Sequence, residues 1–291
     1  MNRANRSASL AIPLALLAGA GLAWAGSQGG LLVGSRPLFA SAVLVAFAIQ
    51  WLAFVPAFIL KTERTYDLTG SFTYISVAIL AVALAGRWDA RALLLLAMVA
   101  VWAVRLGSFL FRRVHRAGKD DRFTEIKQSF VRFLLAWTLQ GLWVSFTLAA
   151  ALAAITTRAT KPLGIAAWIG LAIWIIGFAI EITADMQKKR FRAVPENKGR
   201  FIQSGLWGWS RHPNYFGEIV LWIGVAVVAA PALQGWQWVT LISPVFVTLL
   251  LTKISGIPIL ERRADKTWGG QPEYEAYKSR TPTLILRPPR K

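Results

Sequence analysis

The sequence predicts an all-α, polytopic membrane protein with seven to eight transmembrane helices. Three observations support this prediction. Of the 291 residues, 55% are hydrophobic and only 16% are charged, and the mean hydropathy is +0.48. The apolar residues are also grouped in runs close to the roughly 20 residues that a helix needs to cross the hydrocarbon layer. A soluble domain of this length has more charge and shorter apolar stretches.

The first apolar run, 10–25, follows two arginines and ends in the letters AWA. This pattern resembles a signal peptide with its cleavage site, but we favour a retained span. The further runs lie at 38–60, 68–86, 90–111, 129–155, 163–185, 214–230 and 236–255. The sequence therefore predicts eight spans, or seven if the first run is removed or lies on the membrane surface.

Charge predicts the orientation of these spans. The net charge is +19, and the basic residues lie mainly in the loops 112–132 and 188–211 and in the tail 253–291. Two spans separate each of these regions from the next, so all three fall on one side of the membrane, which the positive-inside rule makes the cytoplasmic side. Both termini are then cytoplasmic. Because the basic residues alternate with apolar runs, they favour an anionic membrane surface over nucleic acid as the partner.

Composition also limits the chemistry. The chain has no cysteine, which excludes disulfides and thiolate or iron–sulfur sites. It has only two histidines, His115 and His212, which disfavours a histidine metal centre. No internal repeat or linker is evident, so we expect a single domain over 1–291 that binds no metal.

The segment 204–224, SGLWGWSRHPNYFGEIVLWIG, joins a basic loop to an apolar run. Pro213 favours the first turn of a helix, and this helix would place Asn214 and Glu218 one turn apart on one face. A helix N-terminus next to arginines such as Arg211 suits a phosphate-bearing ligand. A carboxylate at the start of a membrane span, as at Glu218, needs a partner. The plainer alternative is a basic loop before an ordinary span.

Further candidate residues lie inside the predicted spans, near their ends or in the basic tail: Tyr66, Asp67, Trp102, Arg105, Asp185, Arg192 and Arg280. Each has a structural alternative: Asp67 could cap a helix, Arg105 could neutralise a buried acid, and Arg280 could face lipid headgroups. Under the predicted topology most of them reach the cytoplasmic side. We therefore expect one cavity in which an anionic soluble cofactor meets a lipid-soluble substrate.

The letters RHPNYFGEIVLWIG, preceded by SGLWGWS and followed by a basic tail, resemble the steroid 5-alpha-reductase family and its bacterial branch of membrane reductases. The resemblance covers about 38–291, and the first span is extra. It implies an NADPH-dependent reduction of the C=C bond of an enone lipid, such as a 3-oxo-4-ene steroid. It also implies a bacterial inner-membrane protein whose cofactor site faces the cytoplasm.

The resemblance assigns cofactor contacts to Arg105, Asp185, Arg192, Asn214, Glu218 and Arg280. Asp67 matches the spacing of the family's keto-binding glutamate, and Trp102 stands where the family has a tyrosine. The family's tail histidines have no counterpart in SGIPILERR. From their chemistry, Arg192 and Arg211 are candidates for gripping phosphates, because guanidinium binds phosphate oxygens bidentately.

The predicted mechanism needs a hydride, polarisation of the enone oxygen and a proton. NADPH would supply the hydride. Asp67, partly desolvated, would have a raised pKa and donate a hydrogen bond to the carbonyl, assisted by Trp102 or by Tyr66. The letters RHPNY also occur in isoprenylcysteine and phospholipid methyltransferases, so an S-adenosylmethionine-dependent methyltransferase is the main alternative. A non-catalytic lipid-binding or transport protein is the second alternative.

Overall fold

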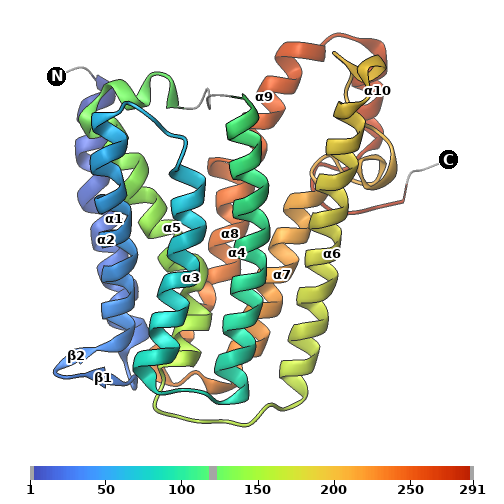
Figure 1. Cartoon of the computed structure of the whole chain (residues 1–291). Helices are drawn as coiled ribbons and strands as arrows, with labels where there is room; N and C mark the ends of the chain where they lie inside the picture. The colour runs from blue at the N-terminus through green and yellow to red at the C-terminus, as the bar shows by residue number, and fades with distance from the viewer. Residues whose placement is uncertain (1–2, 118–122, 289–291) are drawn as a thin grey trace. The chain divides into compact units, whose positions relative to one another are not determined.

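The computed structural model describes residues 3–117 and 123–288 (Figure 1). Eight helices among these residues are long and apolar enough to cross a membrane, which confirms the all-α, multi-pass prediction. Their bounds are Arg3–Ser27, Leu38–Ile59, Tyr66–Ala85, Ala90–Arg112, Phe130–Thr156, Ile165–Ala193, Pro213–Ala232 and Gly235–Trp268.

The chain forms two compact units, which we describe separately. Unit 1 extends to Ala167 and also includes Ala226–Ser243. Unit 2 consists of Trp168–Val225 and the chain from Pro244 onward.

Unit 1 contains five long helices. They are α1 (Arg3–Ser27), α2 (Leu38–Ile59), α3 (Tyr66–Ala85), α4 (Ala90–Ala117) and α5 (Phe130–Thr156). A short antiparallel hairpin, β1 (Leu32–Val33) with β2 (Arg36–Pro37), joins α1 to α2. Of the candidate spans, α5 is the most deeply buried, and it packs against α1, α2 and α3. Its alanine-rich second half allows this close packing on several sides.

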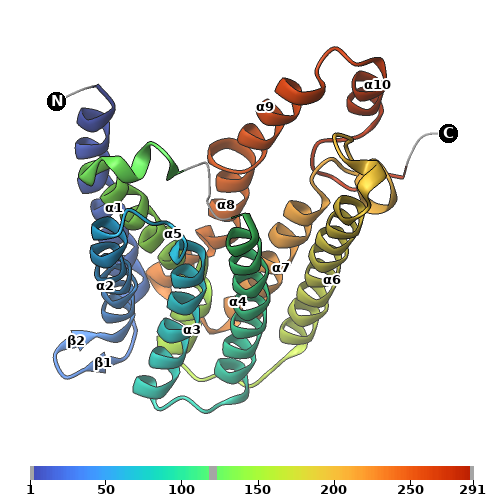
Figure 2. The same cartoon turned by 45° about the horizontal axis from the view of Figure 1, so that its top comes forward.

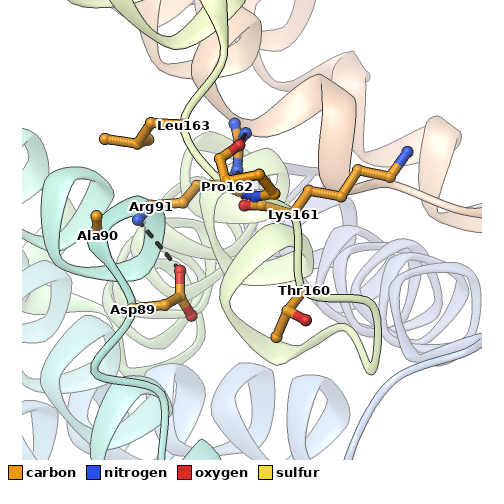
Figure 3. A pocket seen from close by; sticks show the side chains of 7 residues that line it. All are labelled: Asp89, Ala90, Arg91, Thr160, Lys161, Pro162 and Leu163. Atoms are coloured by element: carbon orange, nitrogen blue, oxygen red, sulfur yellow. Dashed lines mark hydrogen bonds between the residues drawn. The ribbon is translucent and has the colours of Figure 1, made fainter.

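Arg91, at the start of α4, joins three parts of unit 1. Its buried guanidinium donates hydrogen bonds to the backbone carbonyls of Lys161, Pro162 and Val228. The Asp89 carboxylate accepts a hydrogen bond from the backbone N–H of Arg91 (Figure 3). Asp89, Arg91, Lys161 and Pro162 are among the residues that line a small cavity of about 160 Å³. Because the guanidinium already binds three carbonyl oxygens, we interpret Arg91 as a structural residue and not as a ligand-binding group of this cavity.

Unit 2 contains most of α6 (Ile165–Ala193) and the first part of α7 (Pro213–Ala229), which lie side by side (Figure 2). Glycines bring their backbones together. A Cβ on Gly217 would lie 2.6 Å from the backbone nitrogen of Glu181, and one on Gly177 would lie 2.5 Å from that of Leu221. Small residues at a membrane helix interface permit this close approach.

The apolar run in α6 ends at 185, but the helix continues to Ala193. Its last turn contains Arg190 and Arg192, and basic side chains there interact favourably with the negative end of the helix dipole. Apolarity alone therefore underestimates the length of this helix.

The last span is composite, which apolarity did not indicate. A 3₁₀ segment (Gly235–Leu241) leads into α8 (Ile242–Leu249) and then into a π-helical turn (Leu250–Ile254). The helix is interrupted at Ser255 and Gly256, and Pro258 lies in the first turn of the next helix, α9 (Ile257–Trp268). A last short helix, α10 (Pro272–Arg280), follows. Pro258 fits the start of a helix because it lacks the N–H that a continuous helix would pair.

Candidate functional site

The N-terminus of α7 has the geometry that the sequence predicts. The helix begins at Pro213, so Asn214 and Glu218 lie one turn apart. Glu218 is buried, with 7% exposure. Asn214 is half-buried, and its side-chain amide makes no hydrogen bond to another residue within the described part of the chain. An amide in this position can donate to a ligand and accept from it.

Two further acids are buried on α6. Glu181 and Asp185 lie four residues apart and are 2% and 8% exposed. Together with Glu218 they give unit 2 three buried carboxyl groups on two packed helices, and each of the three interacts with its surroundings. Buried acids within membrane helices are expensive and mark functional sites.

Glu261 on α9 holds the two residues that precede Pro213. Its carboxylate forms an ion pair with the Arg211 guanidinium, which also donates to Thr283 Oγ1 at 2.6 Å. The other carboxylate oxygen lies 2.7 Å from Nε2 of His212. Burial lowers the pKa of His212, although the carboxylate opposes this effect. Arg211, a predicted phosphate ligand, is therefore already engaged by a carboxylate.

The tail packs against the segment that joins α6 to α7. The Tyr277 hydroxyl donates to the Trp207 carbonyl at 2.8 Å, and burial raises the pKa of this tyrosine, which keeps the donor proton in place. Arg280 donates to the Gln203 side chain at 2.6 Å and is exposed. Arg192, at the end of α6, is exposed as well. These contacts lie within unit 2 and hold the polar tail against the segment between α6 and α7.

In unit 1, Asp67 lies in the first turn of α3 and is partly exposed. The neighbouring Tyr66 donates its hydroxyl hydrogen bond to the Ala136 carbonyl at 2.9 Å. Its ring packs against Phe123 and Trp137 at centroid distances of 4.7 and 5.1 Å. These contacts give Tyr66 a packing role in this structure.

Trp102 is buried on α4, where its ring meets the edge of Tyr74 at 5.0 Å and 87°. Tyr74 is seven residues beyond Asp67 on α3, which corresponds to about 10 Å along the helix axis. Arg105 lies one turn further along α4 than Trp102, with its guanidinium 5.4 Å from the Phe109 ring centroid. Asp67 thus lies at the start of α3, and the aromatic pair Tyr74–Trp102 lies about two turns further along that helix.

The predicted site residues fall into two groups. Tyr66, Asp67, Trp102 and Arg105 lie in unit 1, and Asp185, Arg192, Arg211, Asn214, Glu218 and Arg280 lie in unit 2. That both groups line one cavity stays a prediction. Within the described residues, no cluster of three or more His, Asp or Glu side chains could hold a metal ion.

Sequence reasoning missed the role of Glu261. Its partners Arg211 and His212 lie 50 and 49 residues earlier in the chain. The only available signal is a carboxylate directly after the last apolar run, and this signal does not identify a partner.

The fold and the polar residues define a multi-pass integral membrane protein with buried acids in two of its long helices. By sequence comparison the chain belongs to the family described as "Protein of unknown function (DUF1295)", whose profile matches residues 53–281. The helix α1 lies outside the matched region.

Curated relatives show partial similarity. The chain is 36% identical over 69 residues to 3-oxo-5-alpha-steroid 4-dehydrogenase 1 of Bos taurus, covering 24% of this chain and 26% of that protein. It is 23% identical over 177 residues to Uncharacterized protein C594.04c of Schizosaccharomyces pombe, covering 50% and 52%. It is 30% identical over 66 residues to Probable O-methyltransferase ustE of Ustilaginoidea virens, covering 23% of each chain.

The chain therefore matches only about a quarter of the length of the bovine dehydrogenase. No solved structure matches it.

Proposed function

We propose that this protein is a membrane-embedded, NADPH-dependent reductase of the C=C bond of an enone lipid, with a 3-oxo-4-ene steroid as the model substrate. Three findings support the proposal: the multi-pass helical fold, the partial similarity to a 3-oxo-5-alpha-steroid 4-dehydrogenase, and the α7 N-terminus. A lipid-soluble substrate would reach the site from the bilayer and the nucleotide from the cytoplasm. The proposal includes cytoplasmic termini.

The observation that carries the proposal is the start of α7. The unengaged amide of Asn214 lies one turn before the buried Glu218, at a helix N-terminus next to a basic segment. This donor set fits a dinucleotide, because N-terminal N–H groups and arginines bind phosphates while neutral and acidic groups bind ribose and carboxamide. Glu218 and Asp185 would orient the nicotinamide and ribose.

We assign the nucleotide phosphates to Arg192 and Arg280, whose side chains are exposed. Arg105 would contact the nicotinamide half, as the family resemblance implies. Arg211 is paired with Glu261, so in this proposal it organises the segment before α7 and leaves the phosphates to other arginines.

The substrate chemistry rests on Asp67. When bound, NADPH supplies a hydride to the β carbon of the enone, and a proton added to the α carbon completes the saturated ketone. A protonated Asp67 would donate a hydrogen bond to the substrate oxygen as negative charge develops there. Trp102 would line the apolar chamber, and its N–H could add a second donor. Tyr66 would hold the first turn of α3 in place through its bond to Ala136.

Asp67→Asn tests this assignment. General-acid assistance contributes a factor of about 100 to 10,000, so we expect at least a hundredfold loss of enone-dependent NADPH oxidation. NADPH affinity, measured by fluorescence titration of the detergent-solubilised protein, should change less than about threefold, which is less than the loss of one net hydrogen bond, because the proposal places Asp67 at the substrate oxygen and not at the nucleotide. Glu125→Gln, which alters an exposed carboxylate, is the matched control. An equal loss of NADPH binding in Asp67→Asn would assign Asp67 to helix capping.

An S-adenosylmethionine-dependent methyltransferase is the second candidate. It is favoured by the partial similarity to a probable O-methyltransferase and by the RHPNY letters before α7. The buried Glu218 and the acid at the start of α3 favour the reductase. If neither NADPH nor S-adenosylmethionine bound, a lipid-binding or transport protein would be favoured.

A further inference from the structure

His212 is fixed in place immediately before α7. It is 5% exposed, and its backbone N–H donates to Ser210 Oγ at 3.1 Å. Its ring nitrogen Nε2 lies 2.7 Å from the Glu261 carboxylate, whose other oxygen is held by Arg211. The imidazole can therefore neither swing outward nor turn over without breaking a buried contact.

The contact with Glu261 determines which nitrogen has the proton. A carboxylate accepts hydrogen bonds, so Nε2 must be the donor, and in a neutral imidazole the other nitrogen, Nδ1, then has a lone pair. Burial favours the neutral ring, and the charges of Arg211 and Lys188 favour it as well, whereas Glu261 favours the protonated ring. Nδ1 is thus a hydrogen-bond acceptor of fixed direction.

This acceptor has no partner in the described part of the chain. Nδ1 is buried, and no hydrogen bond reaches it from residues 3–117 or 123–288. Buried polar atoms are almost always paired, so an exception indicates a group that the chain itself does not supply. The ring of Tyr215 lies parallel to the imidazole, with the two ring centroids 5.8 Å apart, so it packs on a face of the imidazole and leaves Nδ1, whose lone pair lies in the ring plane, without a partner among the described residues.

We propose that Nδ1 of His212 accepts a hydrogen bond from an N–H or O–H donor of the bound nucleotide, and that Glu261 is the residue that positions it. The inference rests on the proposed function and adds a contact to the same site. The donor cannot be a fully ionised phosphate, which offers only acceptor oxygens. Two parts of a nicotinamide nucleotide have such donors: the ribose hydroxyls and the carboxamide NH₂.

Paired substitutions test the contact. In His212→Gln the amide nitrogen can still reach Glu261 from the Nε2 position, but no acceptor remains at Nδ1. In His212→Asn an oxygen can occupy the Nδ1 position. We expect the Kd for NADPH to rise about tenfold in His212→Gln, the value of one net hydrogen bond, and to rise less in His212→Asn, which keeps an acceptor at the Nδ1 position but loses the contact with Glu261. His115→Gln, at the other histidine, should leave it unchanged.

Substitutions of Glu261 test the positioning role. Glu261→Gln retains an oxygen that accepts from Nε2, whereas Glu261→Ala releases the ring. Nucleotide affinity should therefore fall in Glu261→Ala and be largely rescued in Glu261→Gln. The melting temperature of each nucleotide-free variant, compared with wild type, shows whether a loss of affinity is a loss of folding. Equal affinities of folded Glu261→Ala and wild type would remove the positioning role.

The 3-acetylpyridine analogue of NADP⁺ lacks the carboxamide NH₂ and separates the two donor sources. If the carboxamide is the donor, His212→Gln weakens NADP⁺ but not the analogue; if a ribose hydroxyl is the donor, it weakens both. Unchanged affinity of folded His212→Gln for both would overturn the inference and leave the proposed function intact. If the wild-type protein bound no nicotinamide nucleotide, this result would contradict the proposed function and therefore also the inference that rests on it.

Discussion

Glu261 organises the basic end of unit 2 through two side chains that the chain places next to each other. Its carboxylate neutralises Arg211 and orients His212, so one residue on α9 determines the state of the two residues that introduce α7. The Arg211–Glu261 pair is partly buried, with side-chain exposures of 14% and 22%, so removing one partner would leave an uncompensated charge that is only partly solvated. In the proposed site, a substitution of Glu261 would therefore affect both folding and nucleotide binding.

We predict that stability falls on acidification through His212. Its pKa in the folded protein is lowered below the ordinary value of 6.5, chiefly by burial. The unfolded chain then takes up the proton first, so the contribution of this group is fully present above about pH 6.5 and is lost as the pH falls toward the folded value. The melting temperature of wild type should decline between pH 8 and pH 5.

His212→Gln removes this titration. Its melting temperature should decline less than that of wild type over the same range, whereas His115→Gln should follow wild type. Parallel curves for wild type and His212→Gln would show that the buried histidine does not contribute to the acid sensitivity.

The α6–α7 pair shows how an element positions a site. Gly217 lies directly before Glu218 and within contact of the α6 backbone at Glu181. We predict that Gly217→Ala destabilises the protein by about 1–3 kcal/mol, because the added methyl group has no space and the helices must separate. Gly21→Ala is the control, since no atom lies within 4 Å of a Cβ at Gly21.

Thermal unfolding in detergent measures both variants. A melting temperature of Gly217→Ala equal to that of Gly21→Ala would contradict the close packing of α6 and α7. The same variant should also weaken nucleotide binding, because a shift of the helix moves Glu218.

At the scale of elements, apolar runs and proline placement were sufficient to predict the spans and the start of α7. Pro213 begins that helix because its fixed backbone angle suits a first turn and does not depend on distant contacts. The composite last span was not predictable in this way, because its π-turn and break at Gly256 leave the apolar pattern intact.

Tertiary contacts were also beyond the sequence. The sequence does not show whether the Tyr66 hydroxyl binds a substrate or a backbone group. The packing of α5 against α3 places the Ala136 carbonyl 2.9 Å from this hydroxyl. The pairing of Glu261 with His212 likewise depends on how α9 folds back toward the start of α7. Residue type indicated the chemistry of these groups but not their partners.

At the scale of the whole molecule, charge distribution predicts orientation. The natural chain has no cysteine, so a single introduced cysteine reports its own accessibility. Ser35 and Ser279 are both exposed, in the hairpin after α1 and in α10. With cytoplasmic termini, a membrane-impermeant maleimide added to intact cells should label Ser35→Cys and should label Ser279→Cys only after lysis. The reverse pattern would place the nucleotide site outside the cytoplasm.

The central claim is that this membrane protein binds a nicotinamide dinucleotide. A ligand that binds only the folded state stabilises it in proportion to the logarithm of its concentration. The most direct measurement is the melting temperature of the purified full-length protein in detergent, titrated in parallel with NADPH and S-adenosylmethionine. We predict a melting temperature that rises with the logarithm of the NADPH concentration and does not change with S-adenosylmethionine. A rise with S-adenosylmethionine alone would contradict the reductase assignment.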